Sequence, residues 1–260
     1  MKFQLKNIAI VMVAALTFTA CSNEDDSNTI SGNGTLKLEF DNVYGDADFA
    51  FNTPYTNSNG EVIKATNAIY IVSNIVLTKE DGSTYTVPKA DSYFFVNEAD
   101  AASTLLSLPN IPAANYTKVS FGIGIDQEQY NAGGDNQVDL WERAAELGMT
   151  WTWLSGYKFV KFEGTATTPS NTDANYRVHT GKTGDVYNYA SVTLDLPENA
   201  LVRTNITPQI HIMADLKEIV DGTTKINFED GLDVMGGTPV QNIMANNVPN
   251  MFEVHHVHND

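Results

Sequence analysis

Leu36-Lys37-Leu38-Glu39-Phe40 alternates apolar and charged residues, which is the pattern of a β-strand with one buried face. Residues 68–72 and 75–77 follow, and both runs are rich in the β-branched and aromatic side chains that favour strands. Asp81-Gly82 is a hairpin turn signal, with residues 85–87 as the returning strand. These stretches predict antiparallel β-structure from residue 35 onward.

The rest of the chain continues this pattern, with few helical signals. Further strand candidates cover residues 93–96, 119–125, 157–162, 187–196, 206–213 and 225–228. One short helix is predicted between Asp139 and Gly148, and a second begins at Thr238-Pro239. Many short strands joined by turns predict an all-β fold: an antiparallel β-sandwich or open barrel with one or two short helices. Because no second linker interrupts it, we expect residues 35–260 to form one domain.

The N-terminus has the features of a signal peptide over residues 1–20. Lys2 and Lys6 precede an apolar run, residues 8–20, that is shorter than the roughly 20 apolar residues a membrane-spanning helix needs. Small residues then come directly before Cys21, the only cysteine of the chain. This arrangement resembles a lipobox, so Cys21 is predicted to become the lipid-bearing first residue of the mature protein.

Residues 21–34 are polar and are predicted to be the lipidated N-terminus and a linker. They contain Glu24-Asp25-Asp26, which resembles the acidic tag that sends some lipoproteins to the cell surface. We therefore expect an outer-membrane lipoprotein, facing the periplasm or the outside, that contacts the membrane through the lipid on Cys21. With Cys21 acylated, the mature domain has no thiol for a disulfide or a metal.

The charge of the chain excludes one class of partner. The formal net charge is −17, and removal of the leader with its two lysines makes the mature chain more negative still. Such a surface repels phosphate backbones, so we expect no nucleic-acid binding.

Histidine is the residue type most suggestive of a site. There are five histidines, and His255, His256 and His258 lie within the last six residues. In an extended segment, His256 and His258 project to one face and His255 to the other. Imidazole pairs of this kind suit Cu(II) or Zn(II). A solvated histidine-rich tail is the other interpretation of the same spacing.

Tryptophan is the second informative residue type. Trp151 and Trp153 are two residues apart and would share a face on a strand. Three interpretations fit this pair: a buried aromatic cluster, a platform that stacks on sugar rings, or a tryptophan beside a metal that is chemically modified.

Five blocks of sequence, in order, resemble one family. The block Met149-Thr150-Trp151-Thr152-Trp153-Leu154-Ser155-Gly156-Tyr157-Lys158-Phe159-Val160-Lys161-Phe162-Glu163-Gly164 is similar to the signature of MbnP-like proteins. These are secreted relatives of the copper-binding protein of methanobactin gene clusters. The other blocks cover residues 69–77, 119–126, 176–181, which contain an H-x-G motif, and 244–259. Together they extend the resemblance from residue 36 to the C-terminus.

The resemblance implies a mononuclear copper site built from histidines. His179 matches the H-x-G histidine, and His256 and His258 match a C-terminal pair. In characterised members a tryptophan beside the metal is oxidised to kynurenine, a change attributed to a di-haem peroxidase-like partner. Trp151 or Trp153 is the matching candidate here.

Two further expectations concern the surroundings of these histidines. A ligating imidazole offers its second nitrogen to an acceptor, and Asp126, Glu163 and Asp260 are candidate acceptors between which the sequence does not choose. His211 has no counterpart in the resemblance, so we expect it to be an ordinary strand residue.

We expect a binding protein rather than an enzyme, because the sequence has no Gly-x-Ser-x-Gly, Gly-x-x-x-x-Gly-Lys or His-Glu-x-x-His motif. The predicted function is that of a lipid-anchored envelope protein that binds one copper ion in copper acquisition or handling. A di-haem peroxidase-like protein and a metal-uptake receptor are its candidate partners. The alternative is a metal-free adhesion module that recognises glycan through its tryptophan pair.

Overall fold

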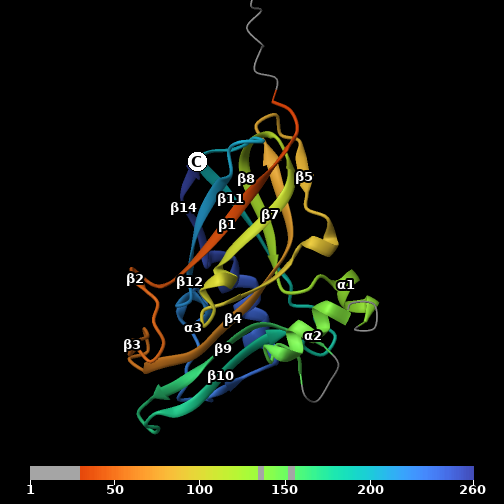
Figure 1. Ribbon diagram of the computed structural model, residues 1–260. Helices are drawn as coiled ribbons and strands as arrows, with labels where there is room; N and C mark the ends of the chain where they lie inside the picture. The colour runs from red at the N-terminus through yellow and green to blue at the C-terminus, as the bar shows by residue number, and fades with distance from the viewer. Residues whose placement is uncertain (1–29, 134–137, 152–155) are drawn as a thin grey trace, which may run out of the picture.

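Two β-sheets packed on each other make up most of the fold (Figure 1). The computed structural model describes residues 30–133, 138–151 and 156–260. Cys21 and Trp153 therefore lie outside the described residues. The predicted all-β fold class is confirmed, and its helices are short.

The elements follow one another from the N-terminal strand to the C-terminal strand. The strands are β1 (Asn33–Tyr44), β2 (Ala47–Asp48), β3 (Tyr55–Thr56), β4 (Val62–Lys79), β5 (Thr84–Thr86), β6 (Tyr93–Asn97), β7 (Leu105–Pro112), β8 (Ala114–Ile123), β9 (Lys158–Thr167), β10 (Ala174–Gly181), β11 (Ala190–Val202), β12 (Pro208–Asp215), β13 (Asp233–Val234) and β14 (Phe252–Asn259). The α-helices are α1 (Gln127–Ala132), α2 (Val138–Glu146), α3 (Glu218–Asp221) and α4 (Gly237–Asn242).

The five-stranded sheet has the order β14-β12-β1-β2, with β7 also paired to β1. The nine-stranded sheet has the order β11-β8-β4-β9-β10-β13, with β3, β5 and β6 also paired to β4. Most pairs are antiparallel, as predicted, but β1 pairs with β12 in parallel and β10 with β13 in parallel. In Figure 1 the C-terminus lies near the start of β1, so the last strand returns to the end of the molecule at which the described chain begins.

The alternation on β1 builds the core between the sheets. Leu36, Leu38 and Phe40 are buried, as the pattern predicts. The Phe40 ring meets Phe121 of the other sheet edge-on, with the ring centroids 5.5 Å apart, and Phe252 of β14 at 6.1 Å. Because the side chains of a strand alternate, the polar residues of β1 lie on the outer face of this sheet, beside the polar residues of β12 and β14.

Two local predictions need correction. Residues 68–72 and 75–77 are parts of one strand, β4, which continues through Asn74 in a left-handed backbone conformation (φ 50°). Residues 225–228 form no strand. Phe228 of that segment is buried because its ring packs on Tyr176, at 4.7 Å between centroids, so its apolar pattern reflects core contact rather than strand pairing.

The hairpin at Asp81-Gly82 is confirmed, since β5 pairs back on β4 and Gly82 has φ 82°. The two predicted helices correspond to α2 and α4, while α1 and α3 were not predicted. Among the described residues, none of the helices has the length and apolar character needed to cross a bilayer.

Candidate metal centre

His179 lies on β10, on the same face as Glu163 of the neighbouring strand β9. His179 is 4% exposed, and its Nε2 lies 2.6 Å from Oε1 of Glu163. A carboxylate can only accept this hydrogen bond, so Nε2 of His179 carries the proton. Glu163 is thus the acceptor that the sequence could not select from three candidates.

The other ring nitrogen of His179 is free. Its Nδ1 is buried and has no hydrogen-bond partner among the described residues. Burial lowers the pKa of His179, although the Glu163 hydrogen bond acts in the opposite direction. The hydrogen bond from His179 in turn lowers the pKa of Glu163. The result is a neutral imidazole whose Nδ1 lone pair is available, which is the form that binds a metal.

Trp151 packs beside this histidine. The two ring centroids are 5.8 Å apart with 61° between the planes, and the Trp151 side chain is 7% exposed. Its Nε1 donates to the carbonyl oxygen of Tyr157 at 3.0 Å, which fixes the orientation of the indole. We call Trp151, Glu163 and His179 the Trp–His corner. The buried position of Trp151 removes it as a platform for sugar stacking.

The space around Gly181 explains why the H-x-G motif has glycine at its last position. A Cβ at this position would lie 2.6 Å from the carbonyl oxygen of Tyr157 and 3.4 Å from the Trp151 ring. Only glycine lets β10 pass this close to the turn that holds the indole.

Two lysines border the corner. Lys158 lies with Nζ 5.7 Å from the centroid of the Trp151 ring and donates to the carbonyl oxygen of Gly148 at 2.8 Å. Burial and the nearby charge of Lys161 lower the pKa of Lys158. Nζ of Lys161 lies 3.8 Å from Oε2 of Glu163, so the carboxylate is held by a cation on one side and the imidazole on the other.

His256 and His258 lie on β14, and their Nε2 atoms are 2.8 Å apart. The prediction that they share a face is therefore confirmed. The prediction that His255 points to the other face is wrong, because Nδ1 of His255 lies 2.7 Å from Nδ1 of His256. The pairing with β12 shifts at this point, from His211↔His256 to Ile212↔Val254, so His255 is the extra residue of a β-bulge. A bulge re-aims one side chain, which breaks strict alternation.

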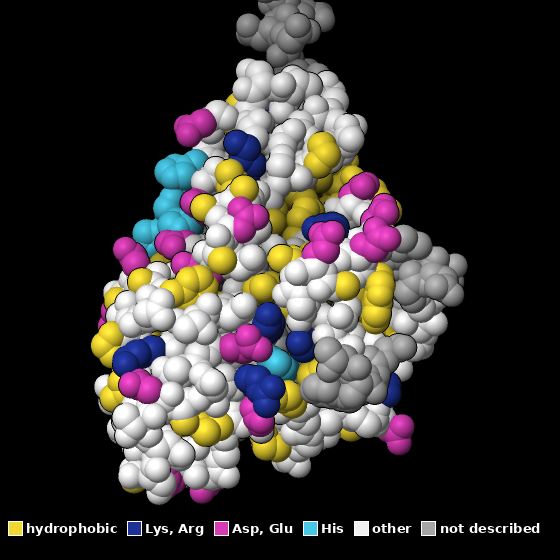
Figure 2. Space-filling model, turned by 60° about the horizontal axis from the view of Figure 1, so that its bottom comes forward, with side chains coloured by type: hydrophobic (Ala, Val, Ile, Leu, Met, Phe, Trp, Pro, Cys, Tyr) yellow, Lys and Arg dark blue, Asp and Glu magenta, His cyan; other side chains and the backbone are white. Residues whose placement is uncertain are grey.

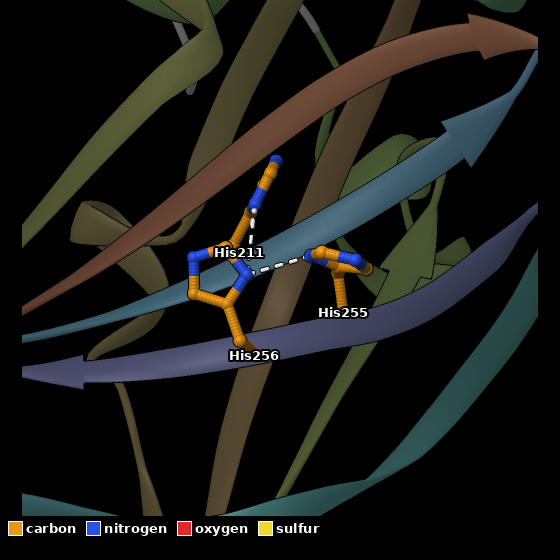
Figure 3. A group of neighbouring side chains, drawn as sticks. All are labelled: His211, His255 and His256. Carbon is orange, nitrogen blue, oxygen red and sulfur yellow. Dashed lines mark hydrogen bonds between the residues drawn. The ribbon is translucent and has the colours of Figure 1, made fainter. Parts of the chain in front are cut away.

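His211 joins this group from β12. Its Nδ1 lies 3.3 Å from Nδ1 of His256, and its Nε2 lies 3.1 Å from Oδ2 of Asp41 on β1. Figure 3 shows His211, His255 and His256 converging, and one ligand atom from each lies within 4.8 Å of the others. We call His211, His255, His256 and His258 the histidine strip. The sequence analysis set His211 aside because it has no counterpart in the family resemblance. Its contact with β14 depends on a cross-strand register that local patterns do not reveal.

The structure does not bring His179 together with His256 and His258. His179 belongs to the nine-stranded sheet and contacts Glu163 and Trp151, whereas the strip belongs to the five-stranded sheet. Figure 2 shows histidine side chains in two separate places, a strip along one edge and a single spot nearer the other end of the molecule. The predicted set of three ligands is thus divided between two sites.

The fold and the buried Trp–His corner define the class of protein: a two-sheet β-protein in which a tryptophan packs on the histidine of an H-x-G motif. The chain belongs to the MbnP family, whose model matches residues 33–243. It shares its fold with the solved structure of MbnP from Methylosinus trichosporium, at 14% identity and a TM-score of 0.51, over 87% of this chain and 99% of that chain. A search of curated proteins gave no match. The family match includes the Trp–His corner and ends before β14.

Proposed function

We propose that this protein binds a single copper ion at the cell envelope and that the ion lies in the Trp–His corner, with His179 as a ligand. The observation that carries the proposal is the buried Nδ1 of His179, which has no hydrogen-bond partner in the part of the chain that the structure describes. A buried acceptor without a partner is costly, and a bound metal ion would satisfy it. Membership of a family associated with copper supports the choice of metal.

The contacts of His179 support a ligand role. Histidines that bind metals usually donate their second N–H to a carboxylate or carbonyl, which fixes the tautomer and the ring direction. Glu163 does this at 2.6 Å. The neutral state of His179, which burial favours, is the state that can bind a cation.

The corner also indicates why a tryptophan beside the metal would be modified. The described residues supply one free ring nitrogen here, and an indole N–H is a donor that offers no lone pair to a metal. Kynurenine would add an amine and a carbonyl oxygen, both of which bind metals. We propose Trp151 as the modified residue and a di-haem peroxidase-like protein as its modifying partner. A metal-uptake receptor is the candidate recipient of the copper.

The proposal includes the membrane anchor. Cleavage before Cys21 and acylation of its thiol would attach the domain to the outer membrane through the polar residues 22–34. The function proposed is binding and handling of copper rather than catalysis.

The test is the copper content and intact mass of the protein isolated from cells that make it natively, compared with a His179→Gln variant. Wild type is expected to hold one copper per chain and to show the mass of a tryptophan-to-kynurenine change. His179→Gln is expected to lose the copper, and His256→Ala, the matched control, to keep it. A His179→Gln protein that retains the copper with a normal fold would show that the ion lies elsewhere.

A further inference from the structure

The histidine strip lies on the outer face of the five-stranded sheet. β14 is the edge strand and pairs with β12, which pairs with β1. Three of its four histidines follow residue 243, where the match to the family model ends, and neither His211 nor His255 belongs to the ligand set that the family resemblance implies. His211 and His256 are half-buried, and His255 is exposed, so the group is open to ions from solvent.

The outer nitrogens of two of these rings are already occupied. Nε2 of His211 faces the carboxylate of Asp41 at 3.1 Å, and this carboxylate can only accept, so Nδ1 of His211 carries the lone pair. Nε2 of His256 is taken up by His258 at 2.8 Å. In both rings, Nδ1 is thus the nitrogen left on the inner side of the group, where it faces the neighbouring histidine.

Of two separations between the inner nitrogens, one lies in the range of ligands on one ion and the other is slightly shorter. Two nitrogen ligands at about 2.0–2.1 Å from a metal, with ordinary tetrahedral or square angles, are about 2.8–3.4 Å apart. The Nδ1 atom of His256 lies 3.3 Å from that of His211 and 2.7 Å from that of His255. Nitrogens at these distances either share a proton in an N–H···N hydrogen bond or bind one cation through their lone pairs, and a metal ion takes the place of the shared protons.

The surroundings are suited to a cation. Glu39 is the β1 residue paired with His211, and Asp41 lies two residues further along the same face. Figure 2 shows acidic side chains next to the histidine strip. The Asp41–His211 contact is the carboxylate–histidine arrangement that orients metal ligands.

We propose that the histidine strip is a second metal site, in which the Nδ1 atoms of His211, His255 and His256 bind one divalent ion of the nitrogen-preferring class, Cu(II) or Zn(II). Its ligands are all nitrogens, without a thiolate or thioether, which selects Cu(II) over Cu(I). Among first-row divalent ions Cu(II) binds a given nitrogen site most tightly, and more tightly than Zn(II). Open to solvent at the sheet edge, the site exchanges its ion, whereas the Trp–His corner buries its free nitrogen.

The experiment titrates metal-free protein with Cu(II), and separately with Zn(II), above the ordinary histidine pKa of about 6.5. Stoichiometry and affinity come from calorimetry, and the number of nitrogen ligands comes from the electron paramagnetic resonance spectrum of Cu(II). Wild type is expected to bind one ion per chain at the strip, with nitrogen hyperfine splitting. His211→Ala combined with His256→Ala is expected to remove this ion, and Asp41→Asn to weaken it about tenfold.

His179→Gln is the control that separates this site from the Trp–His corner. It is expected to leave the strip ion and its spectrum unchanged, even where it removes copper from the corner. Far-UV circular dichroism confirms that each variant is folded. The proposal is overturned if the double variant binds Cu(II) with the wild-type stoichiometry and spectrum, if wild type binds no ion outside the corner, or if one ion is bound per two chains.

Discussion

The Trp–His corner and the histidine strip use the same residue type under opposite conditions. In the corner one imidazole is buried and held by Glu163, and its second nitrogen has no partner within residues 30–133, 138–151 and 156–260. In the strip three inner nitrogens converge at the edge of a sheet, where solvent reaches them. Under the two proposals, the burial of a histidine rather than the number of histidines decides whether a metal ion is retained or exchanged. A buried site with few donors needs further ligands, while an open site with enough donors exchanges its ion.

The largest expected difference between the two regions is in stability. Trp151→Ala removes a buried indole and its hydrogen bond to Tyr157, so we expect a loss of about 3–5 kcal/mol in the free energy of unfolding. His258→Ala, on an exposed part of β14, is expected to change it by less than about 0.5 kcal/mol. Denaturant unfolding of metal-free protein measures both. Equal effects would mean that the corner is not part of the rigid core.

A smaller loss is expected from Gly181→Ala. The new Cβ would lie 2.6 Å from the carbonyl oxygen of Tyr157, so the backbone beside Trp151 must move. We expect a cost of about 1–3 kcal/mol, typical of an overpacked site. Gly184→Ala is the control for steric crowding, because a Cβ added at Gly184 would meet no atom within 4 Å. The left-handed backbone at Gly184 (φ 56°) gives the control variant a cost from strain alone. A Gly181→Ala protein as stable as wild type, with unchanged tryptophan fluorescence, would show that the close approach does not matter.

The carboxylates that hold the histidines give a matched pair of variants. Glu163→Gln keeps a side chain of the same size but can present its amide N–H to His179, so we expect copper affinity in the corner to fall about 10–100-fold. Asp41→Asn likewise presents an amide N–H to His211. We expect it to lower the affinity of the strip for its ion by about tenfold, the low end of this range, because the strip is more exposed. Each change should affect its own site only. Loss of both ions from either variant would mean that the sites are coupled.

The smallest effect expected is on the pH dependence of stability without metal. Burial lowers the pKa of His179, so the folded protein keeps this ring neutral where the unfolded chain, with a pKa of about 6.5, takes up a proton. The unfolded state then binds more protons, and stability falls as the pH drops below about 6.5. Partial burial and the neighbouring histidines lower the pKa of His256 as well, and this acts in the same direction.

The measurement is the denaturant midpoint at about pH 7.5 and about pH 5.5, on either side of the ordinary histidine pKa, in the presence of a chelator. His179→Gln is expected to reduce the difference between the two midpoints more than His256→Ala does, since His179 is the more deeply buried ring. The opposite order would contradict the assignment of His179 as a neutral buried group.

Local patterns predicted much of the fold. The alternation on β1 was sufficient to predict its buried face, and the Asp81-Gly82 turn was sufficient to predict the hairpin, because each feature depends only on residues that are neighbours in the chain. The parallel pairing of β1 with β12 could not be predicted, since it joins segments about 170 residues apart. Residues 225–228 misled the prediction because burial beside Tyr176 produces the same apolar pattern as a strand.

The candidate sites could be predicted only in part, because sequence patterns do not give the register between strands. The sequence singled out His179, Trp151 and Glu163 as candidates, and the structure places them together. The sequence could not reveal that His211 lies opposite His256 on the neighbouring strand, or that a one-residue bulge turns His255 to the same face. Both depend on register, and a shift of one residue reverses which side chains share a face.

The most direct test of the account is anomalous diffraction at the copper absorption edge from crystals of the natively isolated, copper-containing protein. The account predicts one anomalous peak within bonding distance of Nδ1 of His179, beside the Trp151 position. Soaking with Cu(II) should add a second peak among the Nδ1 atoms of His211, His255 and His256. A copper-containing crystal with no peak at His179 would contradict the central claim that the buried corner is the copper site.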